Sequence, residues 1–353
     1  MSESRLNTAL VGFGKIAQGY DDDKRMATKL RYMTHLSVLR DHPRFKLVSV
    51  AEPLETARQK ARTLVSIDDI AADAAELKNA DNIEVAVLAI PPGSRVDVMR
   101  AFPNLKAVIV EKPIGTTAEE AAEFEHECRS RSLVAQVNII RRGDEFTRSL
   151  AAGELNELVG AIQSVFGIYG NGAHNNGTHM VDLVRMLIGE VDAVHAFGET
   201  EFSEGPLVGD SNFSFALSLA NGKLAQFSPV RFAEYRENGL DIWGTRGRLS
   251  YLSGGLTLLH SAVIPHRTQE KEFEVAADLT RILQPTLGTA LYNLYTNLAA
   301  GIDGDELLSP VSNAVQTARV IDALFESKKA RSTVRVSTET VRSQLGTAPN
   351  KLG

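Results

Sequence analysis

The chain has 353 residues, 43% of them hydrophobic, and 38 basic against 44 acidic residues give a formal net charge of −6. This length favours two domains, because single cores stop growing near ~250 residues, and the negative charge argues against nucleic acid or an anionic membrane as a main partner. No apolar stretch reaches the ~18 residues of a membrane helix, and the apolar segment near the N-terminus leaves no room for a signal peptide, so we expect a cytoplasmic protein.

The first 140 residues alternate short apolar runs with helical patterns. The predicted strands are almost continuously apolar, as strands buried on both faces should be, and they span residues 8–14, 46–53, 84–92, 107–113 and 133–140. Thr116 and Thr117 each precede a glutamate by three residues, which marks a helix start. The single cysteine, Cys128, lies four residues after Phe124 and is predicted to be a buried thiol. The alternation predicts a Rossmann doubly wound parallel sheet.

After residue 140 the pattern is that of an α+β domain. A helical segment ends near Gly153, and several consecutive strands follow, with an Asn221-Gly222 hairpin signal between two of them. This predicts an open, mostly antiparallel sheet with one face covered by helices. Helical patterns return at about 278–300 and at 311–328. We therefore expect a dinucleotide-binding domain at 1–140, a substrate-binding and oligomerisation domain at 141–336, and a polar tail at 337–353.

A glycine-rich turn follows the first strand. Gly12, Gly14 and Ala17 form a G-x-G-x-x-A pattern, in which the glycines permit a tight turn and close approach of a pyrophosphate. Glu52 ends the second strand, where a carboxylate can accept hydrogen bonds from the adenosine ribose and would repel a 2′-phosphate. The turn and Glu52 predict NAD in preference to NADP, although Glu52 as a solvated strand-end carboxylate is the alternative.

An apparent insertion at residues 18–33 separates Glu52 from the glycines by more than the usual ~20 residues. It contains the acidic triplet Asp21–Asp23. Consecutive acidic residues alternate in direction, so a solvated loop is favoured over a metal site.

Lys112 lies at the end of the strand at 107–113, and Pro113 fixes the backbone immediately after it. Ligands of open parallel sheets sit beyond the carboxyl ends of the strands, so Lys112 is placed to hold a substrate hydroxyl and lower its pKa. The alternative is a solvated strand-end lysine.

With these motifs in order, the chain resembles the Gfo/Idh/MocA oxidoreductases from residue 6 to about 329. The resemblance rests on "GFGKIA", "AEP", "EKP", "NIIRRGDEF" and "NNGTHMVDL", followed by "DIWGTRGRL". It implies a cofactor site that comprises Gly12, Phe13, Gly14, Lys15, Ile16, Ala17, Glu52, Pro91, Glu111 and Lys112.

The resemblance also implies catalytic roles. Lys112 corresponds to the family lysine that contacts substrate and nicotinamide ribose, and His179 to the family's general acid/base. Asp182 matches the aspartate three residues after that histidine and shares its helix face, so it could orient the imidazole or bind backbone nearby. The family commonly has an aspartate where this chain has Asn175. Because an amide cannot take a proton, His179 and Lys112 are left to carry the proton transfer.

Further polar residues gather around the predicted substrate. Asn175, Asn176 and Thr178 sit where side-chain oxygens cap a helix N-terminus, and remaining N–H donors there could hold substrate oxygens. His174 is either a substrate ligand or solvated, and no metal site is expected from His174, His179 and Asp182. One of Arg141 and Arg142 is expected to pair with a substrate phosphate or carboxylate, and the other to be structural. Candidates from the second sheet are Tyr169, Asn171, Arg231, Tyr235 and Arg236.

The sequence therefore predicts an NAD-dependent dehydrogenase that acts on a secondary hydroxyl of a sugar, amino sugar, nucleotide sugar or cyclitol. The alternatives are a redox-neutral epimerase, lyase or glycosidase that uses bound NAD, and a non-catalytic sugar- or dinucleotide-sensing regulator. We expect a homo-oligomer, dimer or tetramer, because both alternate faces of residues 212–230 carry apolar or small side chains.

Overall fold

Six parallel strands form the first sheet of the computed structural model, which describes residues 5–203, 205, 207 and 209–336. The strand order is β3-β2-β1-β4-β5-β6, and every neighbouring pair is parallel. The strands span Leu6–Val11 (β1), Phe45–Ala51 (β2), Ile70–Ala71 (β3), Val85–Leu88 (β4), Ala107–Glu111 (β5) and Val134–Asn138 (β6). This confirms the predicted doubly wound sheet and adds β3, which is too short to show a hydrophobic pattern.

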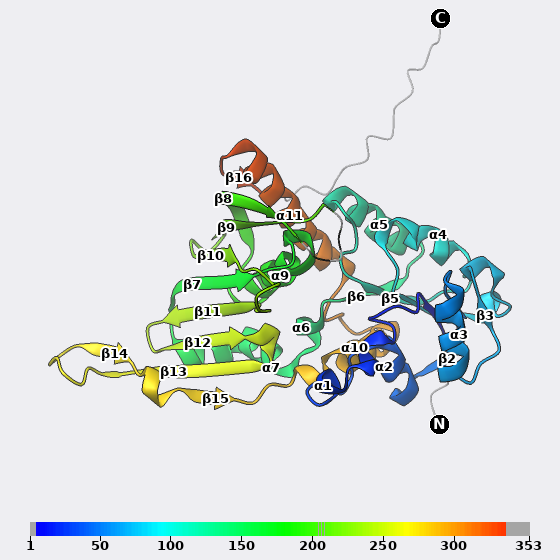
Figure 1. The fold of residues 1–353 in the computed structure, drawn as a ribbon, viewed down its shortest axis with the longest axis horizontal. Coiled ribbons are helices and arrows are strands. Elements are labelled where there is room, and N and C mark those ends of the chain that lie inside the picture. Colours follow the sequence, from blue (N-terminus) through cyan, green and yellow to red (C-terminus); the bar gives the residue numbers. More distant parts are fainter. Residues whose placement is uncertain (1–4, 204, 206, 208, 337–353) are drawn as a thin grey trace, which may run out of the picture.

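Helices cover both faces of this sheet (Figure 1). They are α2 (His35–Asp41), α3 (Glu55–Leu64), α4 (Arg95–Arg100) and α5 (Ala118–Ser130). Thr117 caps α5 by accepting a hydrogen bond from the Glu120 N–H, and the Glu120 carboxylate accepts bonds from Thr116. Cys128 is buried, as predicted, and burial raises the pKa of its thiol to about 12.

The insertion after β1 forms a turn, a 3-10 segment at Gly19–Asp22 and the short α1 (Lys24–Ala27). Each acidic residue of the triplet anchors a different segment: Asp21 accepts a bond from the Thr34 hydroxyl, Asp22 pairs with Lys60, and Asp23 caps α1. In the part of the chain that the structure describes, no group of three His, Cys, Asp or Glu residues is placed to hold a metal ion. The triplet is a structural feature of the insertion.

The second sheet has the order β14-β13-β12-β11-β7-β10-β9-β8-β16, with β15 paired to β13. Its strands span Ile162–Tyr169 (β7), Val191–Phe202 (β8), Ser211–Leu219 (β9), Leu224–Pro229 (β10), Gly239–Gly244 (β11), Gly247–Leu252 (β12), Thr257–Pro265 (β13), Phe273–Val275 (β14), Arg281–Leu283 (β15) and Val334–Arg335 (β16). Neighbours are antiparallel except β7 and β10. Asn221 and Gly222 connect β9 to β10 as predicted, with Gly222 at φ +80°.

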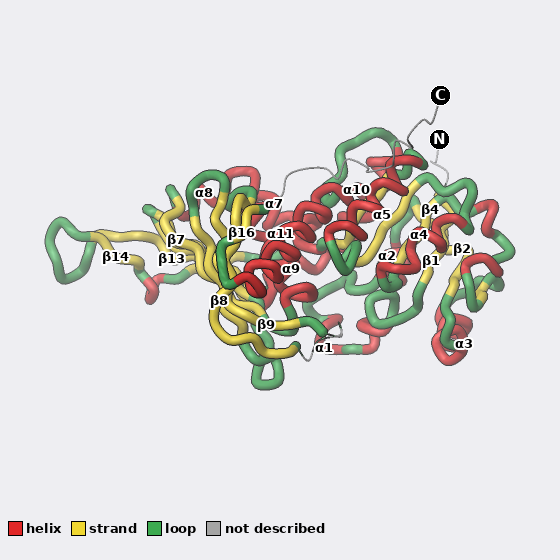
Figure 2. Tube along the Cα trace, turned by 90° about the horizontal axis from the view of Figure 1, so that it is seen from above, coloured by secondary structure: helices red, strands yellow, loops and turns green. Residues whose placement is uncertain are grey.

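Helices lie between this sheet and the first domain (Figure 2). They are α6 (Ile140–Gly143), α7 (Glu145–Ser149), α8 (Leu155–Val159), α9 (Thr178–Leu187) and α11 (Val311–Ala330), with a π turn at Leu150–Glu154 that joins α7 to α8. The predicted helix end near Gly153 is therefore only a kink, because Gly153 adopts φ +130° and the chain coils on to Val159. Over the described residues, no helix has the length and apolarity needed to cross a membrane.

The helix predicted at 278–300 begins later than expected. Residues 281–283 form β15 on the edge of the second sheet, Pro285 follows, and α10 occupies only Ala290–Ile302. Helix α10 packs into the first domain, where Leu291, Leu294 and Leu298 share a core cluster with residues of β1, β2, β4 and β5. The chain thus returns to the first domain after it has built most of the second sheet.

His42 sits in the aromatic part of this α10 contact. Its ring is 3% exposed and lies between Phe45 and Tyr292, with ring centroids 4.9 and 4.7 Å away. Nδ1 accepts a hydrogen bond from the Arg44 N–H, and Nε2 bonds to the Thr296 hydroxyl. Burial, reinforced by the charge of Arg44, lowers the pKa of His42 to about 4.

We expect His42 to make the protein acid-sensitive. Between about pH 6.5 and 4 the unfolded chain binds a proton at His42 that the folded chain does not, so the free energy of unfolding falls as the pH drops. The expected loss is roughly 1–3 kcal/mol. Urea unfolding at pH 7 and pH 4.5 should show a smaller difference for His42→Gln than for the wild type. The exposed His126→Gln is the control, and an unchanged pH slope in His42→Gln would contradict the assignment.

Candidate active site

The glycine turn meets the requirements of a dinucleotide site. Gly12 has φ +89°, and a Cβ there would lie 2.5 Å from the Ala89 carbonyl oxygen, so a side chain is excluded. At Gly14 a Cβ would meet nothing within 4 Å, which leaves that side of the turn open. The turn, Glu52, Pro91 and Lys112 all follow the carboxyl ends of adjacent parallel strands, so they share one edge of the sheet.

Glu52 is buried and holds the glycine turn in place. One carboxylate oxygen accepts a 2.6 Å hydrogen bond from the Phe13 N–H, and the other accepts a 2.9 Å bond from the Leu54 N–H. The alternative of a solvated strand-end carboxylate is therefore wrong, because the residue is only 6% exposed. Each carboxylate oxygen keeps a further lone pair, so the group can still accept a bond from a ribose hydroxyl.

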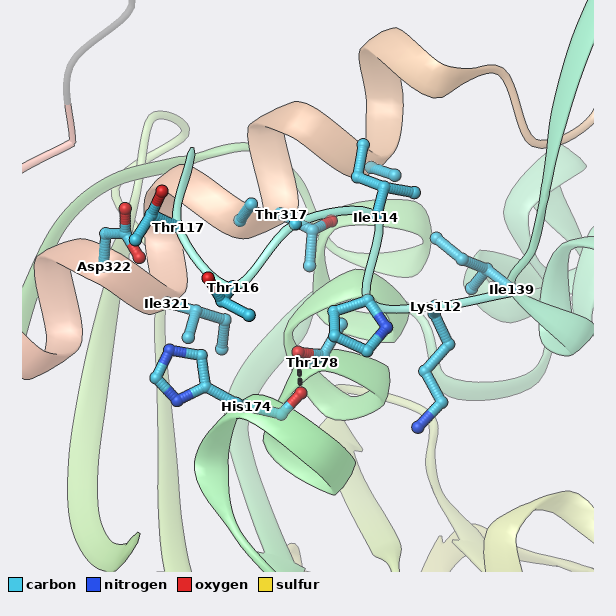
Figure 3. A pocket seen from close by; sticks show the side chains of 14 residues that line it. Lys112, Ile114, Thr116, Thr117, Ile139, His174, Thr178, Thr317, Ile321 and Asp322 are labelled. Carbon is cyan, nitrogen blue, oxygen red and sulfur yellow. Dashed lines mark hydrogen bonds between the residues drawn. The ribbon is translucent and has the colours of Figure 1, made fainter. Parts of the chain in front are cut away.

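Lys112 is held by Asn175 across the junction of the two domains. Its Nζ donates to the Asn175 side-chain oxygen at 2.8 Å and to the Asn175 carbonyl at 3.3 Å. Burial lowers the pKa of Lys112, with Glu111 opposing this shift and Arg141 adding to it. Figure 3 shows the ammonium group of Lys112 pointing away from the His174 ring, although both residues line the same small cavity. Lys112 is therefore not a solvated strand-end lysine.

Glu111 anchors the strand end from which Lys112 extends. One of its oxygens lies 2.9 Å from His35 Nε2 and accepts a 2.6 Å bond from Asn138, and His35 Nδ1 lies 2.7 Å from the Tyr295 hydroxyl. Burial opposes ionisation, but His35, Asn138 and Lys112 together hold the pKa of Glu111 below its usual value. His35 and Tyr295 were missed by the sequence analysis, because they come from the start of α2 and from α10, far from Glu111 in the sequence.

His179 is the second residue of α9 and lies close to both Lys112 and Arg141. Its Nδ1 is buried and has no hydrogen-bond partner among the described residues. Burial, followed by the charges of Lys112 and Arg141, lowers the pKa of His179 well below 6.5. The imidazole is therefore neutral near pH 7 and can accept a proton from a bound group.

Asp182 ties three helices together. Its carboxylate, 1% exposed, accepts bonds from the Nε of Arg142 at 2.9 and 3.1 Å and from the Asn313 amide at 2.9 Å. Thr317 and Arg185 lie at 3.3 and 3.9 Å. This network assigns Asp182 and Arg142 to the packing of α6, α9 and α11, so Arg142 is the structural arginine of the pair.

The start of α9 is not capped by the predicted side chains. Thr178 and Asn176 donate to the carbonyls of His174 and Gly170, respectively, the first of these bonds being drawn in Figure 3. The cap comes instead from Asp210, whose buried carboxylate accepts bonds from the N–H groups of His174 and Asn175 at 3.1 and 3.0 Å. The predicted capping by side chains of this segment is therefore wrong.

Asp210 also explains why residue 172 is a glycine, since a Cβ there would lie 1.8 Å from an Asp210 oxygen. The His174 ring lies 3.4 Å from Asp210 and stacks on Phe325 with centroids 4.2 Å apart, so it is not simply solvated. His174 and Asp210 line an open pocket together with Pro92, Pro113, Thr116, Leu207 and Gly209. The sequence analysis missed Asp210 because in the sequence it is an isolated aspartate before a strand, with no motif around it.

The candidates from the second sheet separate into two groups. Tyr169 is fully buried, and its hydroxyl bonds to the backbone of Phe213, so it supports the sheet. Arg231, Tyr235 and Arg236 are exposed in the segment after β10, and Asn171 has φ +66° in the turn before α9. In the described part of the chain, no hydrogen bond or ion pair joins the side chains of these four residues to Lys112 or His179.

Two family models match the chain. Residues 6–139 match the model described as "Oxidoreductase family, NAD-binding Rossmann fold", and residues 167–250 match the "GFO/IDH/MocA C-terminal domain". The chain belongs to the Gfo/Idh/MocA family of oxidoreductases. The resemblance seen in the sequence motifs is thereby confirmed. The prediction that the first domain of this Gfo/Idh/MocA protein is an NAD-binding domain is confirmed as well.

Individual relatives are distant. The chain is 24% identical to scyllo-inositol 2-dehydrogenase (NAD(+)) of Bacillus subtilis over 56% of this chain and 58% of that enzyme. It is also 24% identical to levoglucosan dehydrogenase of Pseudarthrobacter phenanthrenivorans over 58% of this chain and 64% of that enzyme. The alignments thus span less than two thirds of either relative.

The fold itself matches over nearly the full length. The structure of the WlbA dehydrogenase from Bordetella pertussis, in complex with NADH and UDP-GlcNAcA, aligns with a TM-score of 0.71 at 17% identity and covers 95% of this chain and 100% of that one. This likeness shows that both domains have the family arrangement.

Proposed function

We propose that this Gfo/Idh/MocA protein is an NAD-dependent dehydrogenase that oxidises a secondary hydroxyl of a carbohydrate-like substrate or reduces the corresponding ketone. The observation that carries the proposal is that Lys112, held by Asn175 at the edge of the dinucleotide-binding sheet, lies near a neutral His179. The named activities of the inositol and levoglucosan dehydrogenases support this substrate class.

The glycine turn, Glu52 and Pro91 would hold the cofactor, whose nicotinamide accepts the hydride of the substrate's C–H bond. Lys112 donates a hydrogen bond to the reacting hydroxyl and stabilises the negative charge that develops on its oxygen. His179 takes the hydroxyl proton, which leaves a ketone, reduced cofactor and one proton on the imidazole. Asn175 orients Lys112 without accepting a proton, and His174 and Asn176 border the substrate.

We expect His179→Ala to lower kcat by on the order of 10²–10⁴, the usual size of general-base catalysis, while NAD binding remains intact. Lys112→Ala should lower kcat and also raise KM, because Lys112 contacts the ground state as well as the alkoxide. NADH absorbance on a panel of sugars, nucleotide sugars and inositols measures both effects. His126→Ala, at an exposed position of α5, is the matched control. Near-normal turnover by His179→Ala would show that the proton leaves by another route.

We expect NAD to bind more tightly than NADP by at least about tenfold, or about 1.4 kcal/mol, because the Glu52 carboxylate would face the 2′-phosphate. Isothermal titration of both cofactors measures the preference. Glu52→Gln keeps the size of the side chain and removes its charge, so it should reduce the difference in affinity between NAD and NADP. Stronger binding of NADP by the wild type would refute the role of Glu52.

Redox-neutral chemistry with tightly bound NAD is distinguished by its kinetics. In that case the substrate is converted without net NADH, and NAD copurifies with the protein. A sensing regulator would bind sugar and NAD without converting either.

We further propose that two copies associate through the outer face of the second sheet. Helices cover the inner face, whereas Phe166 on β7 and Leu224 on β10 are 48% and 45% exposed. An apolar sheet face of this kind is stabilised when a partner covers it.

Light scattering at micromolar concentration should report a dimer or tetramer. Phe166→Glu should dissociate the oligomer, whereas Phe273→Glu on the distant β14 should not. A monomeric wild type at that concentration would rule the association out.

A further inference from the structure

Arg141 is a buried cation without a carboxylate partner. It is 6% exposed, its Nε is buried without a hydrogen-bond partner, and no ion pair joins its guanidinium to an acidic side chain of the described residues. Its polar neighbour is the Tyr251 hydroxyl. Residue 254 is a glycine, and a Cβ at that residue would lie only 3.1 Å from Arg141 Nη2, so the glycine leaves space beside the guanidinium. Burying a cation in this way is costly unless a ligand or a residue compensates it.

The other buried arginines are compensated by the fold. Arg95 donates three hydrogen bonds to the carbonyls of Ile90 and Pro113. Arg185 forms a two-pronged ion pair with Glu190. The neighbouring Arg142, which is less buried, is neutralised by Asp182. Arg141 differs from all of these, so its compensation is expected to come from outside the chain.

A second cation, Lys112, lies near Arg141. Lys112 lies near enough for the two cations to repel each other, which adds to the effect of burial on the pKa of Lys112. Two nearby carboxylates have other hydrogen-bond partners. Glu111 is bonded to His35 and Asn138, and Asp210 accepts hydrogen bonds from backbone N–H groups. Both carboxylates oppose the charge of Lys112, but neither of them pairs with the Arg141 guanidinium.

We propose that Arg141 binds a carboxylate that the substrate carries beside its reacting hydroxyl, so that the substrate is an acidic sugar, an aldonic or uronic acid. This inference rests on the proposed dehydrogenase function and names its substrate class. The planar guanidinium presents paired N–H groups that match a carboxylate. Because Arg141 is close to both Lys112 and His179, the anion it binds must belong to the same small sugar as the hydroxyl, whereas a nucleotide diphosphate would lie farther out.

Such a substrate would also make the His179 imidazole a stronger base. The charge of Arg141 is one of the causes that keep the pKa of His179 low. A bound carboxylate neutralises that charge, so His179 becomes a better proton acceptor only when the acidic substrate is in place. A neutral sugar would leave the charge of Arg141 uncompensated.

Thermal unfolding tests the proposal without relying on turnover. D-gluconate and D-glucuronate are compared with D-glucitol, D-glucose and glucose 6-phosphate, each added to the cofactor-free protein and to the NADH-saturated protein. We expect the two acids to raise Tm at millimolar concentration and the neutral sugars to have no effect. Arg141→Gln should weaken binding of the acids by about 10- to 100-fold, as for the loss of a hydrogen bond to a charged group.

Two further variants complete the design. Arg141→Lys keeps the charge without the paired geometry and should fall between the wild type and Arg141→Gln. Arg267→Gln, at an exposed ion pair near β14, should bind the acids as the wild type does. Without ligand, Arg141→Gln should be at least as stable as the wild type, because an uncompensated buried charge has been removed. A lower ligand-free Tm would show that Arg141 is structural and would overturn the proposal.

The remaining outcomes separate this inference from the proposed function. Equal binding of acidic and neutral sugars, or tighter binding of glucose 6-phosphate, would overturn the carboxylate assignment. Production of NADH from neutral sugars, with undiminished activity in Arg141→Gln, would also overturn the carboxylate assignment. It would still support the proposed dehydrogenase activity. Binding of acids through Arg141 without any NADH would support the site and refute the dehydrogenase.

Discussion

The hydrogen bond between the Lys112 ammonium group and Asn175 is the contact on which the site depends. It joins the edge of the parallel sheet to the start of α9, and it does so with a neutral partner. A carboxylate at residue 175 would have neutralised the lysine. With an amide there, residue 175 does not neutralise Lys112, whose charge adds, with that of Arg141, to the effect of burial that lowers the pKa of His179. The substitution thus sets the charge of the whole site.

Support for this contact comes from both sides. Glu111, bonded to His35 and Asn138, fixes the strand end that carries Lys112. Asp210 fixes the turn that carries Asn175, by binding its N–H group and that of His174. Charged side chains used in this way cost desolvation, and each is compensated by several short hydrogen bonds. Positioning of the lysine is therefore shared by segments that lie far apart in the sequence.

The sequence was sufficient for everything that depends on local pattern. The parallel strands, the glycine turn, the hairpin at Asn221-Gly222 and the placement of Lys112 follow from hydrophobic periodicity, turn chemistry and the rule that ligands gather at the carboxyl ends of strands. What could not be predicted depends on pairings between distant segments. The cap from Asp210, the pairing of Asp182 with Arg142 and the bond between His35 and Glu111 carry no local signal.

Helix α10 is the clearest example, and it has a consequence for how the protein is made. Leu291, Leu294 and Leu298 complete a core whose other walls are strands from the first 110 residues. During synthesis the N-terminal domain must wait until residue 302 has left the ribosome before that core can close. The nascent parallel sheet is exposed for that time, while most of the second sheet is already available to fold. The second sheet waits longer still, because Val320, Ile321 and Leu324 of α11 belong to its core, so neither domain is complete before the C-terminal helices have been made.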